Sequence, residues 1–91
     1  MLAGERTRAE PWFLLGMIAA EHGNATRAAE LVERAIGLDP GQAAWHAQLG
    51  RLKIQLHDPQ AALQAARRGL ALAPRDAATL DTLGVVLSRA G

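Results

Sequence analysis

The side chains that could carry out chemistry in this 91-residue chain are few and lie far apart in the sequence. The three histidines, His22, His46 and His57, include no pair at the i, i+4 spacing of a helical metal site. The one serine, Ser88, has no histidine or carboxylate beside it to act as a base. Cysteine is absent, which excludes thiol nucleophiles, thiolate metal ligands and disulfide bonds. We therefore predict no catalytic activity, no metal site and no cofactor.

The carboxylates and glycines have positions that ordinary structure explains. Asp39, Asp58 and Asp76 lie at expected helix boundaries, where turn formation and helix capping account for them. The glycines follow a regular repeat and are not gathered into a phosphate-binding loop. Neither residue type therefore points to an active site.

The charge balance argues against nucleic acid and membranes as partners. Ten basic and nine acidic residues leave a net charge of +1, too little for an electrostatic footprint on phosphates. Arg34, Arg67, Arg68 and Arg75 could be read as a basic patch, but acidic residues near Arg34 make a solvated helix face the better interpretation. The longest apolar run, residues 12–20, is far shorter than the ~20 residues of a membrane span. Since the N-terminus has no apolar signal core, we expect a cytoplasmic protein.

The elements that position these side chains repeat every 34 residues. Leu-Gly pairs recur at 15–16, 49–50 and 83–84, and prolines recur at 40 and 74. Trp12, Leu15, Gly16 and Ala19 fall at i, i+3, i+4 and i+7, which is the spacing of one helix face. A fixed period of this length is typical of helical solenoids.

The apolar spacing and the turn residues predict five helices. The first has Pro11 in its first turn and ends before Gly23, and the second runs from Asn24 to about residue 37. The others cover about residues 43–56, 59–72 and 77–90, with Asp58 and Asp76 as caps. Connections this short favour antiparallel neighbours.

Glycines in the middle of three predicted helices need a packing reason. Gly16, Gly50 and Gly84 each cost about 1 kcal/mol of helix stability relative to alanine. A missing side chain lets the partner helix approach closely, and Ala28 and Ala62 are the small residues expected on the facing helices. The pattern predicts antiparallel helix pairs stacked on one another.

The sequence resembles the tetratricopeptide repeat (TPR) family, whose 34-residue pattern is W-x2-L-G-x2-Y, then A-x3-F, then P. Residues 9–42 match it at Trp12, Leu15, Gly16, Ala28 and Pro40. Residues 43–76 form a degenerate copy and 77–91 a half repeat, while residues 1–8 are predicted as an N-terminal tail. The resemblance implies an all-α fold, a right-handed alpha-alpha superhelix (TPR-like solenoid) of about five antiparallel helices.

The resemblance also implies a scaffold for protein–protein interaction, with a protein or peptide docked on the inner surface. On that surface we predict seven contact residues: Phe13, Met17, Arg51, Ile54, Gln55, Val85 and Arg89. The alternative for Phe13 and Met17 is packing against a preceding helix that is lost or absent in this sequence. The Lys and Asn clamp with which some family members grip acidic chain ends has no counterpart at the matching places, so an apolar or amphipathic segment is the expected ligand.

The end of the last predicted helix suggests self-association. That helix has no predicted partner, and we expect Leu83, Val86 and Leu87 to be partly bare and available for a homo-oligomer. Either the segment belongs to a longer array or another copy covers its end. Two other functions are therefore kept beside the scaffold: an accessory domain of a larger bacterial enzyme such as a sulfotransferase or glycosyltransferase, and a self-assembling repeat element.

Overall fold

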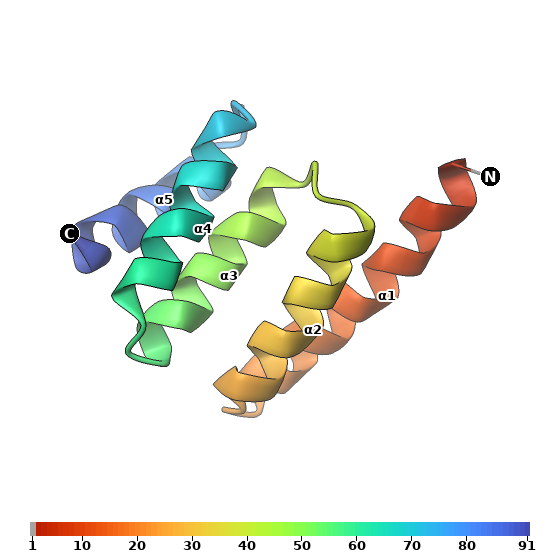
Figure 1. Ribbon diagram of the computed structural model, residues 1–91, viewed down its shortest axis with the longest axis horizontal. Coiled ribbons are helices and arrows are strands. Elements are labelled where there is room, and N and C mark those ends of the chain that lie inside the picture. Colours follow the sequence, from red (N-terminus) through yellow and green to blue (C-terminus); the bar gives the residue numbers. More distant parts are fainter. Residues whose placement is uncertain (1) are drawn as a thin grey trace.

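The computed structural model describes residues 2–91, with side chains from residue 8 onward. Within this range five helices follow one another: α1 (Leu2–Glu21), α2 (Ala25–Leu38), α3 (Ala43–Gln55), α4 (Pro59–Ala71) and α5 (Ala77–Ala90). Figure 1 shows them side by side in chain order, with the two ends of the chain on opposite sides of the molecule. α1 packs on α2, α3 packs on α4, and α5 lies against both α3 and α4. The predicted all-α fold of sequential antiparallel pairs is confirmed.

The first helix begins earlier than predicted. Residues 2–8, expected as a tail, are helical, and Pro11 lies inside α1 and not in its first turn. The upstream turn brings Ala9 against Ala35 and Trp45, where Ala9 is completely buried. Pro11 removes one backbone hydrogen bond from this stretch. The helix nevertheless continues on both sides of the proline, with Ala9 buried on its upstream side.

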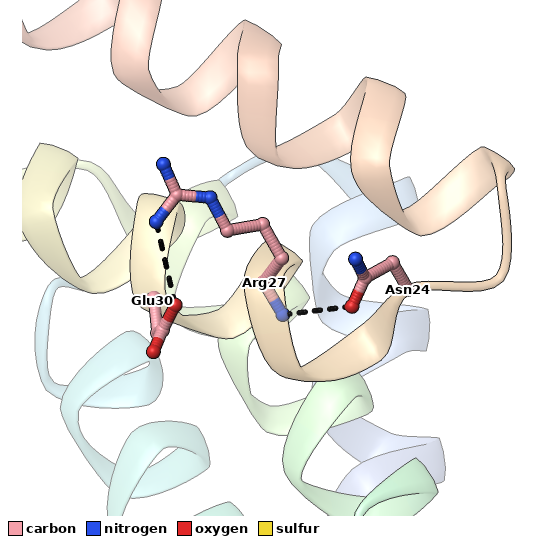
Figure 2. Close-up of polar contacts among 3 residues, drawn as sticks. All are labelled: Asn24, Arg27 and Glu30. Carbon is pink, nitrogen blue, oxygen red and sulfur yellow. Dashed lines mark hydrogen bonds and ion pairs between the residues drawn. The ribbon is translucent and has the colours of Figure 1, made fainter.

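Side-chain caps begin the second helix of each pair, as the sequence predicts. The Oδ1 atom of Asn24 accepts a hydrogen bond of 3.2 Å from the backbone N–H of Arg27 at the start of α2. Figure 2 shows this bond beside the ion pair of Arg27 with Glu30, whose N–O distance is 3.4 Å. Asp58 caps α4 in the same way through the backbone N–H of Ala61, also at 3.2 Å. These caps satisfy N–H groups that have no partner inside the helix.

The cap of α5 has two hydrogen bonds to one residue. The Oδ2 atom of Asp76 accepts from the Thr79 hydroxyl at 2.6 Å and from the Thr79 backbone N–H at 3.0 Å. Thr79 itself is buried. Both hydrogen bonds hold the pKa of Asp76 below the ordinary value of an aspartate, and the bond from the Thr79 hydroxyl has the larger effect.

Thr79→Val is expected to raise the pKa of Asp76 toward its ordinary value, because it removes the main cause of the shift. A lowered folded-state pKa stabilises the fold fully above the unfolded pKa of about 3.9, and that contribution is lost as pH falls through the folded value. The difference in melting temperature between wild type and Thr79→Val should therefore narrow as the pH falls below about 4.

The measurement is a carbon-detected NMR titration of the Asp76 carboxyl group. The control is Thr82→Val on the same helix, since the Thr82 hydroxyl donates to the carbonyl of Ala78 and not to a carboxylate. An Asp76 pKa that is the same in wild type and Thr79→Val would contradict the assigned cause.

His46 is a buried polar residue in the first turn of α3. Only 4% of its surface is exposed, and its Nε2 atom lies 2.9 Å from the carbonyl oxygen of Pro40. A carbonyl only accepts, so this nitrogen carries the proton and donates to Pro40. His46 therefore ties the start of α3 to the preceding turn.

The mid-helix glycines differ according to whether a following helix covers them. A Cβ atom on Gly16 would lie 2.8 Å from Cγ2 of Val32 and 3.2 Å from the carbonyl oxygen of Ala28 in α2. The same atom on Gly50 would lie 3.0 Å from Cγ1 of Val86 and 3.5 Å from the carbonyl oxygen of Ala62. The predicted close approach at Gly16 and Gly50 is confirmed. Gly84, in contrast, has open space around it.

Two of the three residues predicted to be bare on the last helix are buried. Leu83 and Val86 are 0% and 1% exposed, because they point into a core cluster formed by α3, α4 and α5, and Leu87 is half-buried beside them. The prediction of an accessible surface there is wrong for Leu83 and Val86. The large apolar residues that α5 does expose are Leu80 and Val85.

Candidate functional site

Two adjoining hollows run across the first helix of each pair. The hollow between α1 and α3, of about 360 Å³, is lined by Met17, Ala20, Glu21, Gln48, Arg51, Leu52 and Gln55. The hollow between α3 and α5, of about 270 Å³, is lined by Arg51, Ile54, Gln55, Val85, Val86 and Arg89. Because Arg51 and Gln55 belong to both, we treat the two hollows as one surface and call it the inner groove.

The inner groove brings together six of the seven predicted contact residues. Met17 lines the first hollow, and Ile54, Val85 and Arg89 line the second. Arg51 and Gln55 connect them. The placement of these six residues agrees with the sequence-based choice, while their role in binding remains a prediction.

Phe13 is not part of the groove. Its ring stacks on that of Trp45 in α3, with centroids 5.0 Å apart and planes inclined by 14°. Phe13 therefore joins α1 to α3, and its packing partner is a following helix and not the preceding helix that the sequence suggested. Met17 has both roles, because it lines the first hollow and also packs against the core cluster around Val32.

The groove combines an apolar floor with cationic edges. Val85 is 51% exposed, and Ile54 is half-buried because it also packs against the cluster of α3, α4 and α5. Arg51 and Arg89 are exposed on either side of the second hollow, and the Arg51 guanidinium donates to Oε1 of Gln48 at 3.1 Å. Such a surface favours a ligand with an aliphatic side chain next to a carboxylate.

Five residues line the groove without being among the seven predicted contacts: Ala20, Glu21, Gln48, Leu52 and Val86. Leu52 lines the first hollow and Val86 the second, although only 3% and 1% of their surfaces are exposed. In the sequence both look like core residues, because each lies two positions after a Leu-Gly pair of the repeat. Neither could have been assigned to the groove from spacing alone.

The described residues form neither a metal-binding cluster nor a membrane-spanning helix. Across residues 8–91, where side chains are described, no three His, Asp or Glu side chains are grouped closely enough to hold a metal ion. None of the helices in the described range has both the length and the apolar content needed to cross a bilayer.

Comparison with known proteins supports the repeat architecture. The sequence profile of the tetratricopeptide repeat matches residues 19–83. The fold is similar to the crystal structure of a tetratricopeptide repeat domain protein from Salinibacter ruber, with a TM-score of 0.78 and 24% sequence identity. That similarity covers 90% of this chain and 93% of the other. No curated protein matches the sequence significantly.

Proposed function

The chain belongs to the tetratricopeptide repeat family, and on that basis we propose that it binds a segment of another protein in the inner groove. Tetratricopeptide domains are generally protein–protein interaction modules and typically have no catalytic activity. The observation that carries the proposal is the continuity of the groove, because Arg51 and Gln55 join hollows that involve α1, α3 and α5.

The groove chemistry defines the ligand. An aliphatic side chain fits between Ile54 and Val85, and a carboxylate on either side of it would meet Arg51 or Arg89. Arginine forms paired hydrogen bonds with a carboxylate, so it adds direction as well as charge. We therefore expect a partner segment in which an aliphatic residue is flanked by Asp or Glu.

Selection of phage-displayed peptides on the immobilised chain tests this expectation. Selected peptides should share an aliphatic residue next to an acidic one. Their affinity for the double variant Arg51→Glu with Arg89→Glu should fall by at least about tenfold, because two attractive contacts become repulsive. Both arginines are exposed, so the variant should keep the helical circular dichroism of wild type.

The matched control is Arg67→Glu with Arg75→Glu, which reverses two exposed arginines that line neither hollow. Peptides that bind the groove variant and this control equally well would contradict the assignment. A selection that yields no peptide dependent on the groove arginines would do the same.

The two other roles suggested by the sequence stay predictions. An accessory domain of a larger enzyme would use the same groove or edges to contact the catalytic part. A self-assembling element would need a surface other than Leu83 and Val86, since both are buried.

A further inference from the structure

A further hollow, separate from the inner groove, lies on the first helix pair. It has a volume of about 770 Å³ and lies between α1 and α2. We call it the outer cleft; its lining includes Arg8, Pro11, Trp12, Leu15, Arg34 and Leu38. Leu15 and Leu38 are 49% and 44% exposed, and Ile18, one turn after Leu15, is 51% exposed. Large aliphatic side chains gathered this way usually mark an interface.

The repeat itself shows what covers this face. Leu15 and Ile18 correspond, at the 34-residue period, to Leu49 and Leu52 of α3. Leu52 is only 3% exposed, because it packs with Leu49 in the cluster that includes Val32 and Ile36 of α2. The face of α1 formed by Leu15 and Ile18 is therefore the equivalent of a face on which a helix already lies within the same molecule.

The helix that covers this face of α3 is α2, and it makes both an apolar and an ionic contact there. α2 presents the aliphatic side chain of Ile36 together with the carboxylate of Glu33, one turn away. Oε2 of Glu33 lies 3.6 Å from Nζ of Lys53 in α3. An apolar contact accompanied by an ion pair is thus the way in which one helix of this protein covers the next.

The outer cleft offers positive charge to a helix in the equivalent place. The Arg34 guanidinium lies over the Trp12 ring, 4.5 Å from its centroid, and Arg8 lines the same hollow. A guanidinium stacked on an aromatic ring keeps its N–H groups free at the edge to bind a carboxylate. Glu30 and Glu33 line an adjoining hollow with Arg34, but the outer cleft itself is lined by two arginines and no carboxylate, which is complementary to an acidic ligand.

We infer that the outer cleft docks an acidic amphipathic helix of another protein, which lies on α1 as α2 lies on α3. Aliphatic side chains of that helix contact Leu15, Ile18 and Leu38, and its carboxylates bind Arg34 and Arg8. This inference does not depend on the proposed groove function. Leu15 and Met17 are two positions apart, about 200° around the helix, so the cleft and the groove use different faces of α1.

The probe is a fluorescein-labelled peptide of residues 24–39 with Arg27→Gln and Arg34→Gln and blocked ends. It keeps the face of α2 that carries Glu33 and Ile36, and it has three carboxylates and no basic side chain. Titration with the intact chain should give saturable fluorescence anisotropy at micromolar concentrations. Affinity should fall as salt is added, because exposed ion pairs are screened.

Two variants test the residues of the cleft. Leu15→Ser with Ile18→Ser should weaken binding by about tenfold or more, since it removes the exposed aliphatic contacts. Arg34→Gln should weaken it by about fivefold and reduce the salt dependence. All three residues are exposed, so the circular dichroism spectrum should not change. The control Val85→Ser, in the inner groove, should bind the peptide as wild type does.

Three results would overturn the inference. One is the absence of saturable binding up to about 0.5 mM protein, the range of very weak complexes. Another is loss of binding in Val85→Ser but not in Leu15→Ser with Ile18→Ser, which would place the helix in the inner groove. The third is self-association of wild type, seen by sedimentation equilibrium and abolished by Leu15→Ser with Ile18→Ser, which would make a second copy the occupant.

Discussion

Trp45→Ala is expected to lower the free energy of unfolding by about 3–5 kcal/mol, the usual range for an aromatic side chain removed from a core. Trp45 is 7% exposed and packs against Ala9 and Ala35. Its ring also stacks on Phe13, 5.0 Å away. These contacts connect α3 of the second repeat with both helices of the first, so the substitution weakens the connection between repeats.

The loss is large for a chain of this length. Total stabilities of small domains lie near the lower end of about 5–15 kcal/mol, so the variant should be partly unfolded at room temperature. In repeat proteins each unit depends on its neighbours, so loss of the contact should unfold the first repeat most readily. Urea unfolding followed by circular dichroism measures the free energy, and hydrogen exchange identifies the helices that open first.

Trp45→Phe is the matched control, because a smaller ring still stacks on Phe13. It should lose clearly less stability than Trp45→Ala. A loss below about 1 kcal/mol in Trp45→Ala would mean that the two repeats are held together elsewhere, against the ordinary cost of such a cavity.

The sequence predicted α2, α4 and α5 well because local chemistry marks the start of each. Asn24, Asp58 and Asp76 cap the helices that they were expected to cap, and α2 to α5 end within about two residues of the predicted positions. A cap bonds to a backbone three residues away, so its evidence lies within a few letters of sequence.

The sequence was less informative wherever a contact joins distant residues. The early start of α1 places Ala9 against Trp45, which is 36 positions further along the chain. The burial of Leu83 likewise depends on α5 turning its apolar stripe toward both α3 and α4. Helical spacing showed that these residues share a face, but it did not show which helix that face meets.

The same limit explains how the groove was predicted and the outer cleft was not. Positions matched by the repeat pointed to the groove, because equivalent residues of α1, α3 and α5 fall on one surface. The outer cleft instead combines Arg8 and Trp12 of α1 with Arg34 of α2, whereas the equivalent face of α3 is covered by α2. A property of one repeat alone leaves no periodic signal.

The three repeat glycines give the clearest test of how helix contacts determine stability. Gly16→Ala is expected to lower the free energy of unfolding by about 2 kcal/mol, within the range for overpacked cores. The added Cβ would lie 2.8 Å from Cγ2 of Val32, whose branched side chain has little freedom to move, and 3.2 Å from a backbone oxygen. The Cβ atom added by Gly84→Ala has no neighbour, so this substitution should instead raise the free energy of unfolding by up to about 1 kcal/mol through helix propensity.

The comparison is informative because Gly16 and Gly84 occupy the same place in the repeat. The gain in helix propensity is the same at both positions. The two variants should therefore differ in free energy of unfolding by about 3 kcal/mol, and this difference reports the packing of α2 against Gly16, since Gly84 has no neighbour within 4 Å. Thermal unfolding should separate their melting temperatures by more than about 10 °C. Equal shifts for the two variants would mean that α2 does not press on Gly16, and that helix propensity alone determines the effect of a glycine at this position.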